Sequence, residues 1–445
     1  MYGAAAESVR LHDVLDCVCV LAVAPEEAAL FGGGFGGGEP GEFPEEEAAR
    51  HPPHSVVPRL HAVLVAHAPQ PGAPPAGEEA EAAAARAAAL AAAAPALRAQ
   101  CLELLAAALG VRVWRRAQRR TSAPRLRRSL TYWPKHYRMS THCGDAPQGD
   151  ALAAEYLLLH LLSRVHARSE PMVVGALSLN LLGLGSGSDE AAAAAAADAV
   201  VAAVAALAPR LLRRTVSVDA LNAEPWTPRK DYSTGRLGST ALQLAAGTHL
   251  VLDETRLQAG TLYGTGLRNV QALKQLMSEQ KLEVDFDYYK MPLLVDHPVL
   301  VLSQFKSMLA ADVAVPLHAT AQPRPPPPAD DASLGPLRAF LAAARALPHS
   351  IEPDVGAGAC ACAPGAQLRA FVVLTCGIAP RTEVEADLVA ARSADPSLGQ
   401  ETFHRWLTLG RLMAASCGQS SLSSAAWRRV REMEHAVAER IRAER

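Results

Sequence analysis

The residues THLVLDE (Thr248–Glu254) form a short apolar run that ends in two acidic residues. A run of this length and composition predicts a buried β-strand. Around it, from Gly149 to Phe286, strand-like and helix-like segments alternate. This alternation predicts an α/β fold in which a parallel sheet is flanked by helices. The helical pattern that runs from Ala332 to the last residue predicts a helical lid or bundle beside the sheet.

The acid pair Asp253 and Glu254 indicates part of a nucleotide site. In a P-loop ATPase, acids at the end of a buried strand bind Mg²⁺ and activate water. That chemistry also requires a Gly-rich turn with Lys and Ser/Thr around the phosphates. The turn Gly183–Asp189 lies between a predicted strand and an Ala-rich helix, but the chain contains no Gly-Lys dipeptide. We therefore interpret this turn as a plain connection and the acids as a vestigial, Walker-B-like pair, which caps the next helix or pairs with Arg256.

The composition of the chain argues against several classes of function. The chain has 445 residues and a formal net charge of −2, which is long enough for two or three domains and too neutral to bind nucleic acid over its whole surface. We see no secretory signal, and the Ala-rich tracts are too weakly apolar to predict membrane spans. The eight cysteines are expected to be reduced thiols, with Cys360 and Cys362 as the best-placed pair if a metal binds. Because no G-x-S-x-G or H-E-x-x-H motif occurs, we predict no catalytic residue, no metal and no cofactor.

The segment Val111–Arg138 is strongly basic and contains interleaved aromatic residues. Its composition is compatible with three roles: phosphate neutralisation and base stacking, a nuclear import signal, or a solvated tether. If it contacts nucleic acid, the contact would be weak and would use Arg115, Arg116, Arg119, Arg120, Arg127 and Arg128.

Composition also divides the chain into four predicted parts. These are a partial N-terminal β-rich and helical region (1–110), a basic linker (111–145), an α/β core (146–322), and a Pro-rich hinge with a helical C-terminal region (323–445). Within them, Asp13–Ala24 is expected to be a buried strand and Pro171–Leu182 a continuous strand. The charged last helix, Ser423–Arg445, is expected to project into solvent.

Several stretches closely resemble the mini-chromosome-maintenance (MCM) complex-binding protein family, in the right order along most of the chain. They are Leu11–Val23, Val56–His61, GDALAAEYLLLH at Gly149–His160, KDYS at Lys230–Ser233, LVLDET at Leu250–Thr255 with Leu257 and Gly260, and CGQSSLS at Cys417–Ser423. The family carries further residues before the strand at Asp13, so by this resemblance the chain starts inside an N-terminal β-rich domain. The basic and Ala-rich segments have no counterpart that we identify in the family.

The chain is also similar, more faintly, to the MCM helicase subunits. Leu237–Glu254 is similar to the helicase run that leads into the Walker B acids, and Leu273–Gln280 to the helix and Met-Glu-Gln that follow it. Thr402–Ala415 is similar to the helical lid, with His404 near the position of an ATP-sensing Arg. This likeness implies a degenerate AAA+ core that keeps the frame but lacks the phosphate-binding Lys and the sensing Arg.

The resemblance implies a nuclear, non-enzymatic partner of MCM subunits that associates with chromatin indirectly. Such a protein would act in DNA replication, through MCM assembly or unloading, in sister-chromatid cohesion and in the cell cycle. Two alternatives remain at this point: an active AAA+ ATPase, or a DNA-binding replication factor that works through residues 111–138.

Overall fold

The structure is a computed structural model of residues 1–445. It describes residues 9, 14–22, 59–68, 80–110, 150–169, 172–185, 190–232, 236–238, 240–318, 331–347, 381–394 and 398–443. The basic segment 111–138 and the pair Cys360 and Cys362 therefore lie outside the described residues. The chain separates into two compact units, Met1–Gln70 and Pro71–Arg445. The four-part division made from composition stays a prediction.

The first unit contains an antiparallel pair of strands, β1 (Leu15–Ala22) and β2 (Arg59–His67). The prediction of a strand near Asp13–Ala24 is confirmed, but its burial is not. Val18, Val20 and Leu21 are exposed, because a two-stranded ribbon has no second layer within the described part of this unit to cover its faces.

The second unit is built on a five-stranded sheet in which every pairing is parallel, as the alternating pattern predicts. In chain order its strands are β5 (Leu179–Leu182), β6 (Leu211–Thr215), β9 (His249–Asp253), β12 (Val299–Ser303) and β13 (Val313–Pro316). Their spatial order is β13-β5-β12-β9-β6. The run THLVLDE thus supplies β9, which is buried along its whole length.

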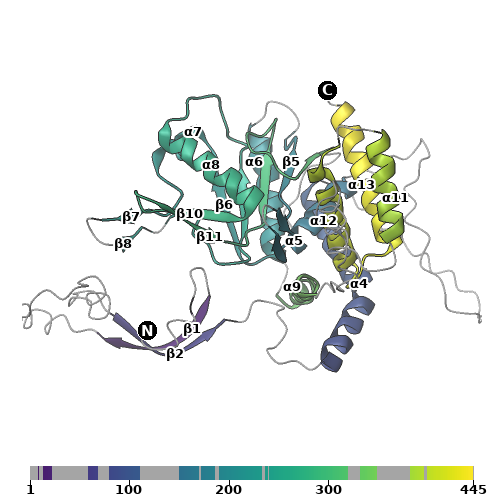
Figure 1. Ribbon diagram of the computed structural model, residues 1–445, viewed down its shortest axis with the longest axis horizontal. Helices are drawn as coiled ribbons and strands as arrows, with labels where there is room; N and C mark the ends of the chain where they lie inside the picture. The colour runs from purple at the N-terminus through teal and green to yellow at the C-terminus, as the bar shows by residue number, and fades with distance from the viewer. Residues whose placement is uncertain are drawn as a thin grey trace, which may run out of the picture. The chain divides into compact units, whose positions relative to one another are not determined.

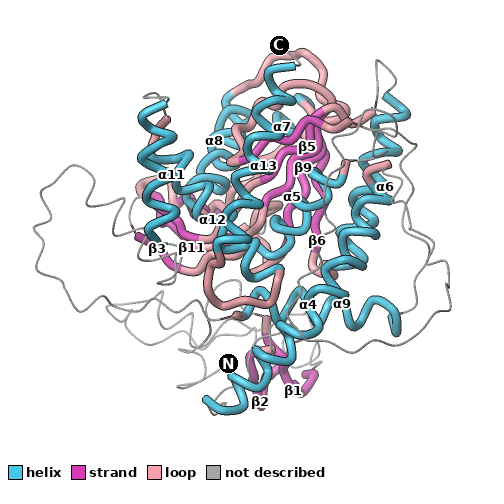
Figure 2. The backbone as a smooth tube through the Cα atoms, turned by 90° about the vertical axis from the view of Figure 1, so that its right-hand side faces the viewer, coloured by secondary structure: helices cyan, strands magenta, loops and turns pink. Residues whose placement is uncertain are grey.

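Helices cover both faces of this sheet (Figures 1 and 2). Alternate residues of β9 point to opposite faces: Val251 joins one apolar cluster, and Leu250 and Leu252 join the other. The Val251 side packs against α4 (Ala80–Ala108), α5 (Ala151–Leu162), α6 (Glu190–Leu207), α9 (Asp331–Ala346), α12 (Gln400–Ser416) and α13 (Ser424–Ala443). The other side packs against α7 (Val218–Ala223) and α8 (Gly264–Glu279). The remaining described helix is α11 (Arg381–Ala394).

Helix α5 is buried along nearly its full length. Asp150 caps its start by accepting a hydrogen bond from the backbone N–H of Ala153, and Ser163 ends it in an extended conformation. The Ala-rich helices α4 and α6 are long and apolar enough to cross a membrane by length and composition alone. Both also contribute residues to the core cluster around α5, with 17% of the most apolar window of α4 and 44% of that of α6 buried.

Two expectations from the sequence are corrected here. The described residues 172–182 form two strands rather than one: β4 (Met172–Val174) pairs with β3 (Ala167–Ser169), and β5 begins only at Leu179. Gly175 separates them with φ +95°, where a Cβ would meet the Arg164 carbonyl at 2.5 Å. Only glycine tolerates this position without strain.

The last helix does not project into solvent. Trp427, Val430, Met433 and Val437 of α13 are buried, and the helix packs against α12 and β13. Their spacing of three and four residues places them on one helix face, while the charges that suggested a solvated helix lie mostly on the other.

Two small hairpins complete the described part of the second unit (Figure 1). One is β7 (Lys230–Asp231) with β8 (Arg236–Leu237), and the other is β10 (Lys281–Asp285) with β11 (Lys290–Leu294).

Candidate functional site

The sheet topology identifies one edge as the place to look for a site. Strand β5 leads through α6 to β6 at one end of the sheet, whereas its neighbour β12 leads to β13 on the other side of β5. The chain therefore leaves β5 and β12 in opposite directions. In open α/β sheets, ligands bind at such a switch point, outside the carboxyl ends of the strands. The turn after β5 and the acids after β9 both belong to this edge.

The turn after β5 is packed closely against the helix that follows it. Gly183 and Gly185 have φ +79° and +78°, and a Cβ on Gly185 would lie 2.6 Å from the backbone of Ala193 in α6. Ser303 at the end of β12 donates a 2.8 Å hydrogen bond to Asn180 of β5. The rest of the turn, residues 186–189, lies outside the described residues.

Asp253 has its hydrogen-bonding capacity filled by protein groups. Arg213 on the neighbouring strand β6 donates to Oδ2 at 3.1 and 2.6 Å, and the backbone N–H and hydroxyl of Thr255 donate to Oδ1 at 3.0 and 2.6 Å. A carboxylate has about four acceptor positions, so none is left for a metal. Burial opposes ionisation of Asp253, but the bonds from Thr255 and Arg213 outweigh it and lower the pKa. The partner of Asp253 is thus Arg213 and not Arg256.

Glu254 is buried beside the loop that follows β12. Burial raises its pKa, and the nearby Ser307 and the backbone of Met308 oppose this shift, but neither carboxylate oxygen makes a hydrogen bond within the described residues. Its own backbone continues the sheet, since its N–H donates to the carbonyl of Leu302 at 2.8 Å. The acid that would activate water in an ATPase is therefore held inside the protein.

His404 lies at the opposite edge of the sheet from the acid pair. Its Nε2 is 3.1 Å from the carbonyl of Val173. Burial lowers its pKa, whereas Val173 and the nearby Asp312, which directly precedes β13, raise it. These neighbours belong to the amino ends of the strands, so His404 does not occupy an ATP-sensing position next to Asp253.

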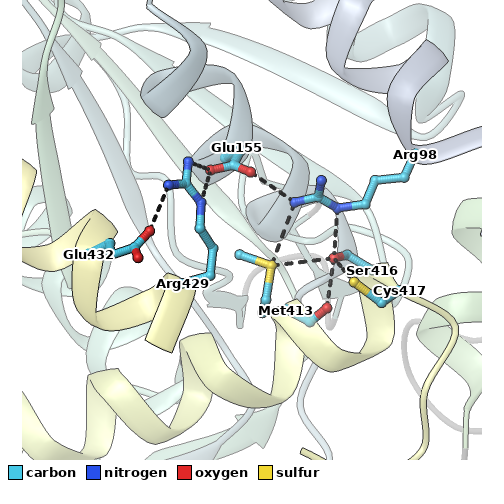
Figure 3. A network of polar contacts seen from close by, with 7 residues as sticks. All are labelled: Arg98, Glu155, Met413, Ser416, Cys417, Arg429 and Glu432. Carbon is cyan, nitrogen blue, oxygen red and sulfur yellow. Dashed lines mark hydrogen bonds and ion pairs between the residues drawn. The ribbon is translucent and has the colours of Figure 1, made fainter. Parts of the chain in front are cut away.

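The family-like stretch at Gly149–His160 forms a structural hub rather than a catalytic motif. Glu155 of α5 binds Arg98 of α4 through Oε1 and Arg429 of α13 through Oε2 (Figure 3). Arg98 also donates to Ser416 at the end of α12, at 3.1 Å. One buried carboxylate thus links four helices.

Two further polar residues of α5 extend this hub. Tyr156 donates to Glu434 of α13 at 2.8 Å, and Glu434 also accepts from Arg405 and Trp406 of α12. The cap residue Asp150 accepts two hydrogen bonds from Arg440 of α13, at 2.7 and 2.8 Å. The sequence marks Tyr156 and Asp150, but it does not indicate their partners on α13, which are 278 and 290 positions away.

Among the described residues, no group of three or more His, Cys, Asp or Glu side chains could hold a metal ion. Cys17, Cys19, Cys101 and Cys417 are free thiols. Burial raises the pKa of Cys101 to about 12, which makes it an unreactive core residue.

The filled acceptors of Asp253 predict that Mg²⁺ does not strengthen ATP binding. We expect a fluorescent ATP analogue to show equally weak binding in Mg²⁺ and in EDTA. The matched comparison is the variant Arg213→Met, because loss of the guanidinium group frees the Oδ2 oxygen of Asp253. Tight Mg²⁺-dependent binding that is lost in Glu254→Gln would contradict this expectation and support an active ATPase.

Comparison with known proteins places the chain in a family. The profile of the family described as mini-chromosome maintenance replisome factor matches residues 139–441. Proteins named mini-chromosome maintenance complex-binding protein are similar to it: one from Arabidopsis thaliana is 37% identical over 66% of this chain and 45% of its own length. One from Salmo salar is 31% identical over 96% of this chain and 60% of its own length, and one from Homo sapiens is 30% identical over 64% and 41%. The chain thus spans about half the length of these relatives. It belongs to the mini-chromosome maintenance replisome factor family, whose curated relatives are MCM complex-binding proteins.

Proposed function

We propose that this chain is a non-enzymatic MCM-binding protein that acts in the nucleus during DNA replication. Family membership, together with the names of the relatives, is the observation that carries the proposal. In this role the protein assembles MCM complexes or unloads them from chromatin, and so also serves sister-chromatid cohesion and cell division. Its contact with chromatin is indirect, through the MCM subunits.

We further propose that the second unit is a degenerate AAA+ module. Three features support this: a five-stranded parallel sheet, a turn and helix after β5 at its switch point, and an Asp-Glu pair at the end of β9. A frame related to that of the helicase subunits would allow the chain to dock on a subunit as a neighbouring subunit does. This step rests on likeness of fold.

The geometry around Asp253 supports a binding role over an enzymatic one. An ATPase needs an acid with free oxygens for Mg²⁺ and a second acid close to water. Here Asp253 is occupied by Arg213 and Thr255, and Glu254 is buried. The frame is therefore more suited to holding a partner than to turning over a nucleotide.

Co-purification tests the binding role. Tagged full-length chain expressed in cells of its own source should recover several MCM subunits, identified by mass spectrometry of the eluate. The variant Glu254→Gln removes the acid that an ATPase would need, and it should recover the same subunits in the same amounts. If the folded wild-type chain recovers no MCM subunit, the proposed function is wrong.

A further inference from the structure

The structure presents a group of exposed aromatic side chains on the two small hairpins of the second unit. We name this group the aromatic platform and define it as residues 229–232 and 283–291. Tyr288 is 92% exposed, Tyr289 59% and Tyr232 49%. Exposed rings gathered on one surface are characteristic of protein interaction sites, since aromatic residues are enriched among the residues that contribute most to binding.

Hydrogen bonds between the hairpins fix the platform as one body. Tyr232 donates to the carbonyl of Phe286 at 2.7 Å, and the backbone N–H of Asp285 donates to the carbonyl of Pro228 at 2.9 Å. Arg229 adds two hydrogen bonds to Asp287. Segments more than 50 positions apart in the chain therefore meet at this surface.

The rings contact one another in two pairs. Phe286 and Tyr289 stack with centroids 4.9 Å apart, and Tyr232 meets Tyr288 edge to face at 6.5 Å. Asp287 adopts φ +62° at the hairpin tip, where its N–H donates to the carboxylate of Asp285. A surface that is already ordered loses little entropy when it binds, which favours affinity.

The platform is also attached firmly to the core. Leu282 and Val284 of β10 are buried, and the strand packs against α8. The side chains of β10 that point the other way, Lys281, Glu283 and Asp285, are only partly buried, which is the alternation of a strand with one face toward solvent. Within the described residues of this face, the rings are therefore not needed to complete the core.

The charges on the platform favour a protein partner over nucleic acid. Arg229 pairs with Asp287, Lys290 pairs with Glu283, and Lys230 lies 5.0 Å from the ring centroid of Tyr232. The hydrogen bond that Lys290 donates lowers the pKa of Glu283, and the hydrogen bonds that Arg229 donates to Asp287 raise the pKa of Arg229. Phosphate binding requires cations that are free to replace counterions, whereas these three are already engaged within the platform. An aromatic centre with a rim of matched charges fits an apolar groove on a protein.

We propose that the aromatic platform is the surface that docks into an apolar groove of an MCM subunit, with Tyr288 and Tyr289 as its anchors. This inference rests on the proposed function and adds the location of its interface. The platform lies on hairpins that branch from the α/β body, so it reaches a partner without any change in the sheet (Figure 1).

The double variant Tyr288→Ala/Tyr289→Ala tests this location. Titration of full-length chain into purified MCM complex should show affinity at least about tenfold weaker than that of the wild type. The matched control is Tyr263→Ala/Phe305→Ala, because these residues are 68% and 74% exposed but lie outside the platform. The control should bind like the wild type. The single variant Tyr288→Ala changes the most exposed ring and should give a smaller loss in the same direction with an unchanged unfolding temperature.

The outcomes separate the two proposals. If the wild type binds MCM complex and the platform variant binds equally well, the platform inference is wrong while the proposed function stands. Equal losses in the platform and control variants would also overturn the inference. The inference would also be overturned if the platform variant altered only DNA binding or self-association and left MCM binding unchanged. If the wild type itself does not bind, the proposed function fails first.

Discussion

Replacing Glu155 by Gln is expected to lower the free energy of unfolding of the second unit by about 3 kcal/mol. The Glu155 side chain is largely buried and neutralises two guanidinium groups, those of Arg98 and Arg429. Without the carboxylate, the two partly buried guanidinium groups lose the anion that they share, and Arg429 keeps the exposed Glu432 as a partner. Breaking a buried ion pair by removing one partner is costly because the remaining charge keeps its desolvation penalty. Urea unfolding followed by circular dichroism measures the loss.

A neighbouring ion pair supplies the control. Glu432 binds the same Arg429 at 3.2 Å, but its side chain is 67% exposed. Exposed pairs contribute about 0–1 kcal/mol, so Glu432→Gln should have little effect on the midpoint of unfolding. Similar losses for the two variants would show that burial of Glu155 does not determine the strength of the network. The triple variant Glu155→Leu/Arg98→Met/Arg429→Met should regain part of the lost free energy of unfolding, since it leaves no buried charge behind.

This network explains why a stretch without catalytic residues is so distinctive in the sequence. Helix α5 must be apolar enough to lie in the core, yet it carries Glu155, Tyr156 and His160 at buried positions. Each of these residues is tolerated only when a specific partner is present. A substitution in α5 therefore affects α4, α12 and α13 together.

Part of the sheet could be predicted from the sequence because two of its central strands are short, mainly apolar runs, whereas β6 (LLRRT) carries two arginines. THLVLDE gives β9, and VLVLS gives β12. Both strands are buried on two faces and hence lack polar alternation, which is the pattern of parallel sheets. Their pairing order was not predictable, since the local sequence of a strand does not specify its neighbour.

The candidate site was predicted only in part, because contacts across the fold determine its chemistry. The position of Asp253 at the end of a strand follows from the sequence. Its engagement by Arg213 does not, because Arg213 lies 40 positions earlier and becomes a neighbour only when β6 pairs with β9. The same limit applies to His404, whose place near Val173 depends on how α12 packs.

The aromatic platform shows the same limit at the surface. The alternating residues of Leu282–Tyr288 are typical of a strand with one face toward solvent, and β10 (Lys281–Asp285) covers the first four of them. The bond from Tyr232 to Phe286, which joins the two hairpins, has no local signature. It was the exposure of the rings in the folded chain that identified them as a surface.

We expect acid to lower the free energy of unfolding of the second unit by a large amount. His160 and His249 are fully buried neighbours with ring centroids 5.7 Å apart. Burial lowers the pKa of His160 to about 4, with Arg345 adding to the shift and the carbonyl of Leu177 opposing it. Burial also lowers the pKa of His249 well below 6.5, and nearby Arg345 and His160 lower it further. Both rings therefore stay neutral in the native state at a pH where an unfolded chain would protonate them.

The direction of the pH dependence follows from this difference. Above pH 6.5 the native and unfolded states both hold neutral rings, so the stability is fully present. Below pH 6.5 the His160 ring is protonated in the unfolded chain but stays neutral in the native state. The free energy of unfolding therefore falls until the pH reaches about 4. The expected loss between pH 7 and pH 5 is about 2 kcal/mol for His160, and His249 adds a loss in the same direction. His160→Gln keeps a donor for Leu177 but cannot titrate, so the loss of unfolding free energy between pH 7 and pH 5 should be smaller by the contribution of His160, about 2 kcal/mol. The carboxylates titrate in both proteins, and comparing slopes cancels their contribution.

His435→Gln, at a 71% exposed position, should leave the slope unchanged. If His160→Gln also leaves the slope unchanged, the buried histidines are not the acid-sensitive groups of this fold.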